Sequence, residues 1–276
     1  MSTVTSVPTG SDRVAAASSA AHAGTPRPTG VVHDTLTVAL RELRPLIREP
    51  FTLVFGMMQP LFFLALFGPL LVRTSGLDGA ATLQWFVPGI IVMSVLFGTS
   101  TTGANLLQDI TTGAHERMLV TPLRRSSLVI GRALEEIVPV LGQAVIIVAV
   151  SVPFGFEPHV ASLLGLVLLA AFGVGLGALS YALAMAAGDN PYVFWMVQQT
   201  VLFPLMLLSG MLLPLDDAPG WLAVLSDLNP LTYLVEAERA LFAGDVSTSA
   251  LWGTIASVAM AGLGLTVAVR GVNKEA

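Results

Sequence analysis

The sequence predicts an all-α protein whose helices cross a membrane six times. Of its 276 residues, 54% are hydrophobic and only 11% are charged, whereas soluble domains carry about 25% charged residues. Six stretches of about 20 or more residues are uncharged, and a helix of about that length crosses the ~30 Å hydrocarbon layer. The predicted spans cover residues 51–72, 83–107, 127–153, 160–187, 192–213 and 249–269.

The chain divides into a short tail and one membrane domain. Ala, Ser, Thr, Pro and Gly fill 22 of the first 30 positions. Such a segment buries too little apolar surface to offset the entropy lost on ordering. We predict a disordered cytoplasmic tail over residues 1–30 and one transmembrane domain over residues 31–276.

An amphipathic helix is predicted just before the first span. Asp34 can cap its start, and Leu36, Leu40 and Leu43 recur near the helical period, with arginines between them. Pro45 breaks or kinks this helix near its end. The pattern favours a helix lying in the membrane interface over a solvated lead-in.

The first three spans contain a few polar residues. Gln59 lies within the first span, and Trp85 near the start of the second can anchor it at the interface. The first turns of the third span carry Arg132, Glu135 and Glu136. The glutamates are interpreted either as interfacial ion-pair partners of Arg132, at helical spacing, or as gating charges.

The fourth span is rich in glycine. Gly173 and Gly177 have the G-x-x-x-G spacing that lets two membrane helices approach closely. The alternative is a span that is glycine-rich without a specific contact. A turn at 188–191 separates it from the fifth span.

The region 214–245, before the last span, changes in character. It holds six acidic residues and only one basic residue. Two short apolar-periodic pieces, 219–228 and 231–242, lie on either side of Asn229-Pro230. We predict two short helices that dip back toward the bilayer.

The basic residues predict the orientation. With six spans, 11 of the 13 basic residues lie on the side of the two termini, and Arg73 and Arg239 lie on the other. The positive-inside rule then places both termini in the cytoplasm and the acidic region outside. The excess of Arg over Lys, with abundant Ala and Gly, points to a high-GC bacterial genome and so to the bacterial plasma membrane.

Several functions are excluded by what the sequence lacks. Lys274 is the only lysine, so no P-loop can bind nucleotide phosphates. The four histidines are scattered and there is no cysteine, so neither a metal site nor a disulfide scaffold is predicted. The thinly spread basic residues also argue against nucleic-acid binding.

The loop between spans two and three is the most informative segment. Residues 114–120 can form about two helical turns, and Pro122 ends them. Arg124 and Arg125 follow at the membrane surface. A plain basic loop is the alternative, but a short amphipathic helix with a Thr-Pro stop is more specific.

Two segments resemble a known family. HERMLVTPLRRSSLVIGR at 115–132 is similar to the signature of type-2 ABC exporter permeases, in the branch of daunorubicin-resistance-like and multidrug exporters. LNPLTYLVEAER at 228–239 resembles the recurrent segment in the last extracellular loop of that family. The resemblance covers roughly residues 34–270.

The resemblance implies a transporter whose membrane-spanning and ATP-hydrolysing parts are separate subunits. The chain would be a permease subunit and not an enzyme, paired with a second permease half, identical or related, and with two cytoplasmic ATPase subunits that bind ATP and Mg. A cytoplasmic coupling helix would carry Glu116, Arg117, Met118, Leu119, Thr121, Pro122, Leu123 and Arg124. An outer gate would include Asn229, Pro230 and Tyr233.

The resemblance to drug exporters, together with the few polar residues in the spans, implies that the cargo is a hydrophobic drug, a lipid or a lipid-linked molecule. Apolar area with a few hydrogen-bonding groups is the usual composition of a ligand site. Such groups occur on the first and fifth spans, although the aromatic ones also suit lipid-facing surface. The candidate pathway residues are Phe55, Gln59, Phe62, Trp195, Gln198 and Gln199.

Three alternatives stay open. The complex could export a polysaccharide. The chain could instead be a proton-coupled secondary transporter that uses Glu135, Glu136 or Asp189, although no strong carboxylate is predicted in mid-membrane. A scaffold that transports nothing is the third.

Overall fold

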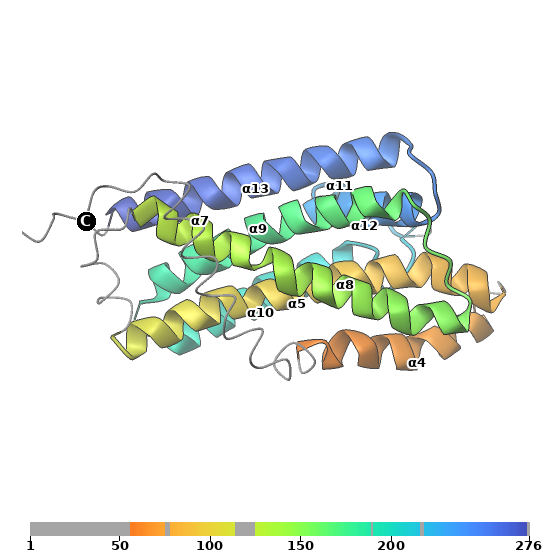
Figure 1. Cartoon of the computed structure of the whole chain (residues 1–276), viewed down its shortest axis with the longest axis horizontal. Helices are drawn as coiled ribbons and strands as arrows, with labels where there is room; N and C mark the ends of the chain where they lie inside the picture. Colours follow the sequence, from red (N-terminus) through yellow and green to blue (C-terminus); the bar gives the residue numbers. More distant parts are fainter. Residues whose placement is uncertain (1–55, 75–77, 114–124, 189, 216–217, 275–276) are drawn as a thin grey trace, which may run out of the picture.

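The protein is a bundle of helices. The computed structural model describes residues 56–74, 78–113, 125–188, 190–215 and 218–274, and within them all regular structure is helical. The long helices run side by side along one axis (Figure 1). In chain order the elements are α4 (Met58–Thr74), α5 (Gly79–Thr111), α7 (Arg125–Glu135), α8 (Ile137–Ser151), the 3-10 turn η1 (Val152–Phe154), α9 (Ser162–Ala187), α10 (Pro191–Leu208), α11 (Gly220–Asp227), α12 (Pro230–Phe242) and α13 (Thr248–Lys274).

Five helical segments are long and apolar enough to cross a membrane. They are Gly79–Thr111, Val129–Phe154, Ser162–Ala187, Pro191–Leu208 and Thr248–Val272. The first predicted span corresponds to α4, which is apolar but shorter, and residues 51–55 of that prediction lie outside the described residues. The chain is therefore a polytopic membrane protein with five long candidate spans in its described part.

The ends of some spans differ from the prediction. The fifth span was expected to continue to residue 213, but α10 ends at Leu208. Ser209 donates its hydroxyl to the carbonyl of Met206, and Gly210 adopts a φ of 71°. Because a left-handed residue cannot continue a right-handed helix, the apolar residues after Leu208 form an irregular turn.

The third span is interrupted near its start. α7 ends at Glu135 and α8 begins at Ile137, with Glu136 in a turn between them. Pro139 has no N–H to donate to the carbonyl of Glu135, four residues earlier, and its ring crowds that carbonyl. The proline thus explains the break, and the break positions Glu136.

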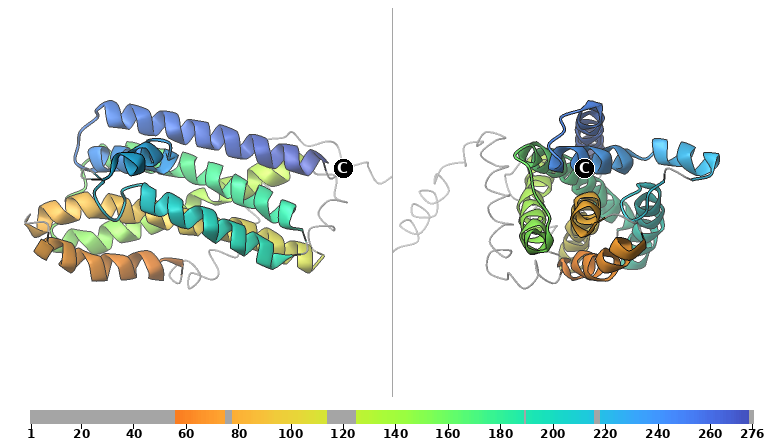
Figure 2. Two further views of the ribbon diagram at one scale, coloured as in Figure 1. Left: turned by 180° about the vertical axis from the view of Figure 1, so that it is seen from behind. Right: turned by 90° about the vertical axis from the view of Figure 1, so that its right-hand side faces the viewer.

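The chain reverses at two opposite ends of the bundle. The end of α5, the start of α7 and the junction of α9 with α10 lie together with the C-terminal end of α13, which we call the inner end (Figure 1). Residues 155–161, 209–215 and 218–247 lie at the opposite, outer end. Seen from the outer end, α12 lies on the bundle, where it packs against α13, α5 and α9, and α11 extends sideways from it (Figure 2). Both predicted short helices are confirmed as helices.

The tightest helix packing joins α9 to α13. This pair forms the most extensive helix–helix contact among the described residues. A Cβ atom on Gly175 would lie 2.5 Å from the backbone of Met260, and one on Gly264 would overlap the carbonyl of Gly175. Gly173 instead faces α5 and α8, where Val95 and Val140 meet it. The close contact of α9 with α13 therefore runs through Gly175 and not through the predicted pair, because Gly177, like Gly173, faces α5 and the region where α7 meets α8.

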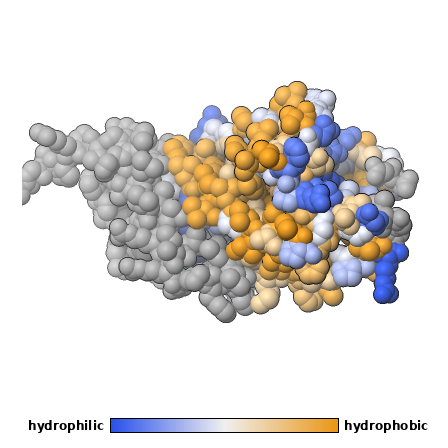
Figure 3. Space-filling model, turned by 45° about the vertical axis from the view of Figure 1, so that its right-hand side comes forward, coloured by the Kyte–Doolittle hydropathy of each residue, from blue (hydrophilic) through white to orange (hydrophobic). Residues whose placement is uncertain are grey.

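The surface of the bundle is apolar, as a lipid-facing surface requires. Large hydrophobic side chains are exposed on α4, α8, α10 and α13, among them Phe62, Val145, Phe203 and Val258. Hydrophobic residues cover the visible flank, and hydrophilic ones gather toward the outer end (Figure 3). The predicted tail and interfacial helix lie outside the described residues.

Candidate functional site

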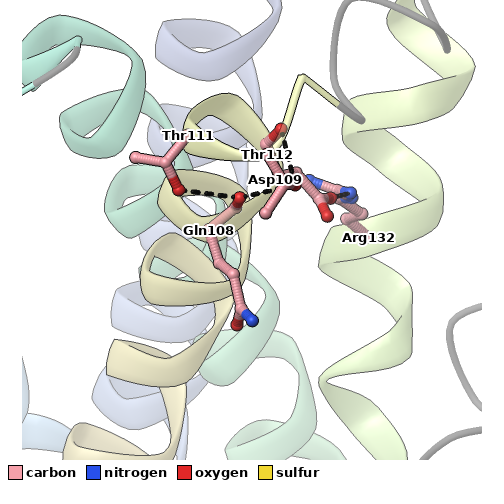
Figure 4. Close-up of polar contacts among 5 residues, drawn as sticks. All are labelled: Gln108, Asp109, Thr111, Thr112 and Arg132. Carbon is pink, nitrogen blue, oxygen red and sulfur yellow. Dashed lines mark hydrogen bonds and ion pairs between the residues drawn. The ribbon is translucent and has the colours of Figure 1, made fainter.

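An ion pair joins the last turn of α5 to the last turn of α7. Asp109, in the last turn of α5, accepts a hydrogen bond from Arg132 of α7 (Figure 4). The Arg132 side chain is 6% exposed, and its guanidinium carbon lies 5.8 Å from the centre of the Tyr181 ring in α9. The pair therefore fixes the two helices that flank residues 114–124.

The predicted coupling residues belong to that flanked segment. All of them, from Glu116 to Arg124, lie outside the described residues. Their proposed contact with an ATPase is therefore argued from sequence and from the helices on either side.

Glu136 lies inside the bundle and not at an interface. It is 4% exposed and accepts a hydrogen bond from the Thr102 hydroxyl of α5. Its other oxygen has no hydrogen-bond partner in the described part of the chain. The predicted pairing of Glu136 with Arg132 is wrong, because the turn before α8 directs Glu136 toward α5 and Arg132 bonds to Asp109.

Asn229 ties the outer helices to the end of α10. Its side-chain oxygen accepts from the Leu231 N–H and so caps α12, as Asn at an N-cap commonly does. Its Nδ2 atom donates to the Leu205 carbonyl at 2.8 Å. Tyr233, one turn later, donates its hydroxyl to the Asp227 carbonyl of α11. The predicted gate residues thus join α10, α11 and α12.

Arg239 fastens α12 to the outer end of α5. Its guanidinium carbon lies 3.9 Å from the centre of the Trp85 ring. Its Nε atom donates to the Trp85 carbonyl at 3.0 Å, and its Nη2 atom donates to the Gly210 carbonyl at 2.9 Å. Sequence reasoning gave Arg239 no role, because its partners lie 154 and 29 residues away.

Replacing Arg239 by Gln is expected to loosen this outer cap. A charged hydrogen bond contributes about 1.5–3 kcal/mol and a cation–π contact roughly 0.5–2 kcal/mol, so we expect a loss of stability of about 2–3 kcal/mol. Thermal unfolding in detergent measures it. Arg239→Lys keeps the charge but loses the planar stack on Trp85, so its stability should lie between that of the wild type and that of Arg239→Gln. An Arg239→Gln variant as stable as the wild type would refute this role of Arg239.

Glu238 is a second buried carboxylate, which sequence reasoning missed. It is 0% exposed, and neither carboxylate oxygen has a hydrogen-bond partner among the residues described. A Cβ atom on Gly165 of α9 would overlap its carboxylate, so glycine makes room for it. The feature of the sequence that could have predicted this burial is the position of Glu238 in the apolar face of α12, between Val235 and Leu241.

The predicted pathway residues lie on different surfaces. Phe55 is outside the described residues, whereas Gln59 and Phe62 are exposed on α4. Trp195 and Gln199 are exposed on α10, and Gln198 is buried. Both α4 and α10 pack against α5. Of the three pathway glutamines, only Gln198 is enclosed by other helices.

Comparisons with known proteins identify the family. Residues 33–243 match the family described as ABC-2 type transporter. The chain is 32% identical over 218 residues to the putative transport permease ycf38 of Cyanophora paradoxa, covering 76% of this chain and 74% of that protein. It is 27% identical over 225 residues to the daunorubicin resistance ABC transporter permease protein DrrB1 of Streptomyces coeruleorubidus, covering 80% and 78%. The inner membrane transport permease YadH of Escherichia coli is 29% identical over 203 residues, covering 70% and 76%.

These matches agree with the absence of a P-loop from the sequence and with the polytopic helical bundle. Nucleotide binding in this family resides in a separate ATPase subunit. The chain belongs to the ABC-2 type transporter family, as a membrane permease subunit without an ATPase domain of its own.

Proposed function

We propose that the chain is one membrane half of a bacterial ATP-driven exporter of hydrophobic drugs, lipids or lipid-linked molecules. A second half, identical or related, completes the pathway, and two cytoplasmic subunits hydrolyse ATP. In this arrangement α4 is the first of six spans, and both termini are cytoplasmic in the plasma membrane.

The observation that carries this proposal is the braced inner end. The Asp109–Arg132 pair joins the two helices that lead into and out of residues 114–124. If an ATPase displaces that segment, α5 and α7 move together, because the ion pair joins them. Glu116 and Arg117 supply charges for the ATPase, and Met118 and Leu119 supply apolar contact.

The outer helices suit a gate. α12 is held to α5 by Arg239 and to α10 by Asn229. A relative movement of α5 and α10 would therefore displace α12. In the proposed cycle, Asn229, Pro230 and Tyr233 move with it and open a path to the outside.

The exposed faces of α4 and α10 suit the second half. Met58, Phe62, Leu66 and Leu70 recur every fourth residue along α4 and are all more than half exposed. This spacing makes one apolar stripe. Lipid can cover such a stripe, and so can the matching helices of a partner half.

The names of the relatives favour a drug over a polysaccharide as the cargo. One relative is a daunorubicin resistance permease, and another, 25% identical over 182 residues, is a probable multidrug ABC transporter permease of Escherichia coli, YbhR. The apolar bundle offers few hydrogen-bonding groups for a sugar polymer. A hydrophobic cargo therefore suits both observations.

Transport into inverted membrane vesicles tests the proposal. The chain is co-expressed with a candidate ABC ATPase from the same genome, and uptake of daunorubicin is followed by fluorescence. We expect uptake that requires ATP and survives a protonophore. The double variant Glu116→Ala/Arg117→Ala should lose at least about tenfold of the rate at equal membrane level, whereas Arg27→Ala, in the tail, should not.

A proton-coupled carrier is the second candidate, because Glu136 is buried inside the bundle. A buried carboxylate in a membrane segment is a common element of proton relays. If uptake follows a proton gradient without ATP, and Glu136→Gln abolishes it, this candidate replaces the first.

A further inference from the structure

A pocket of about 270 Å³ lies between α5, α9, α10 and α13. Its lining is aliphatic or methionine except for Thr99, Ser180 and Gln198, and it contains no charged residue. Val201, which contributes to the lining, is 50% exposed, so the pocket reaches the lipid-facing surface of the bundle.

Two polar atoms in this lining are buried without partners. Ser180 is 8% exposed and Gln198 is 6% exposed, and neither Ser180 Oγ nor Gln198 Oε1 has a hydrogen-bond partner within the described ranges. A buried polar atom without a partner costs roughly 1–3 kcal/mol. The hydrocarbon of a membrane supplies no water to satisfy it.

Several other hydroxyls in the same bundle are satisfied, although Ser257 Oγ also lacks a hydrogen-bond partner among the described residues. Ser94, Thr99 and Ser151 each donate to a carbonyl three or four residues earlier in their own helix. Ser180 does not, and it lies against α5, where a Cβ atom on Gly103 would meet its oxygen at 2.5 Å. The pocket therefore keeps hydrogen-bonding capacity that the protein does not use.

The depth of the pocket points to the inner leaflet. Ser180 lies seven residues before the end of α9, and Gln198 lies seven residues after the start of α10. At 1.5 Å per residue, both are about 10 Å from the inner end. This depth lies within the inner half of the ~30 Å hydrocarbon layer.

We propose that this pocket binds a neutral amphiphile from the inner leaflet, whose O–H or N–H group donates to Gln198 while its hydrocarbon fills the aliphatic lining. Ser180 Oγ lies in the same lining and completes the polar end. The inference deepens the proposed function, on which it rests, by naming the class of cargo that this part of the pathway accepts.

Size and charge narrow the ligand further. Drug-sized ligands occupy pockets of roughly 300–1,000 Å³, so about 270 Å³ accepts one chain or ring portion and not a two-chain lipid. A charged headgroup would be buried here without a counter-charge, at a large desolvation cost. The pocket therefore selects a ligand with an uncharged O–H or N–H donor.

Photolabelling tests the site without an ATPase. The purified permease is placed in nanodiscs of phosphatidylcholine, a lipid without an O–H or N–H donor. Two probes are compared: hexadecanol carrying a diazirine on its chain, and the methyl ether of the same alcohol. We expect the alcohol to label peptides spanning 176–183 and 197–205 about five- to tenfold more than the ether, the ratio that one hydrogen bond provides.

Variants of the pocket residues distinguish hydrogen bonding to Gln198 from nonspecific partitioning of the probes into the bilayer. Gln198→Leu should remove the preference for the alcohol, while Thr200→Val, at an exposed side chain two residues further along α10, should keep it. Val201→Trp should reduce labelling by both probes by narrowing the pocket at its exposed edge. Unfolding temperature checks that each variant is folded.

The outcomes distinguish this inference from the proposed function. Equal labelling by alcohol and ether in the wild type, or a preference that survives Gln198→Leu, overturns the pocket assignment even if the ATPase binds and transport is ATP-driven. Selective labelling in a chain that binds no ATPase keeps the pocket and overturns the exporter.

Discussion

One methyl group at Gly264 is expected to destabilise the bundle strongly. The Cβ atom of Gly264→Ala would overlap the Gly175 carbonyl, where α9 and α13 cross. Neither backbone can yield locally, because each belongs to a long helix in that contact. Overpacking typically costs about 1–3 kcal/mol and occasionally more, and we expect the upper end here.

Gly262 is the matched control. It lies two residues away on the same helix, and a Cβ atom there would meet nothing within 4 Å. Gly262→Ala removes a glycine from a helix interior, which favours the helix by up to about 1 kcal/mol. Thermal unfolding in detergent should lower the midpoint for Gly264→Ala and leave it unchanged or higher for Gly262→Ala. Equal midpoints would show that α9 and α13 do not cross this closely.

The second large effect is expected at the inner end. Asp109→Ala removes a carboxylate partner from the buried Arg132 guanidinium. Breaking a buried pair costs roughly 3–5 kcal/mol, and we expect the lower end because the Asp109 side chain is 29% exposed. Changing both residues, as in Asp109→Ala/Arg132→Leu, should cost less than Asp109→Ala alone because no charge stays behind. Unfolding midpoints of the three proteins form the test.

Asp245→Ala is the control for this prediction, because Asp245 is exposed at the outer end. Exposed substitutions usually stay within about 0.5 kcal/mol. If Asp109→Ala unfolds no earlier than Asp245→Ala, the ion pair does not brace α5 against α7, and the proposed route from the coupling segment loses its support.

The existence of the spans followed from the spacing of charged residues, but their ends did not. The uncharged stretch continued past Leu208, and only the conformation of Gly210 shows why α10 stops. α5 and α13 extend beyond their predicted limits because a helix does not need to end where its apolar residues do.

Contacts between residues far apart in the sequence explain the other differences between the predicted and the observed structure. Glu136 was expected to pair with a residue on its own helix, and it bonds to Thr102, 34 residues away. The acidic region before the last span was placed outside the membrane because of its charges, so the burial of Glu238 in α12 was not predicted. Gln198 and Gln199 are adjacent and chemically identical, and only the packing of α10 against α9 separates them.

Co-purification tests the central claim, that this permease is driven by a separate ATPase which binds residues 114–124. The tagged permease is expressed with a candidate ABC ATPase from the same genome, extracted in mild detergent and captured. The account predicts equimolar ATPase with the wild type, unchanged recovery with Arg27→Ala, and loss of most of it with Glu116→Ala/Arg117→Ala at an unaltered unfolding temperature. A wild-type permease that captures no ATPase, or a double variant that captures it fully and supports full transport, would contradict the account.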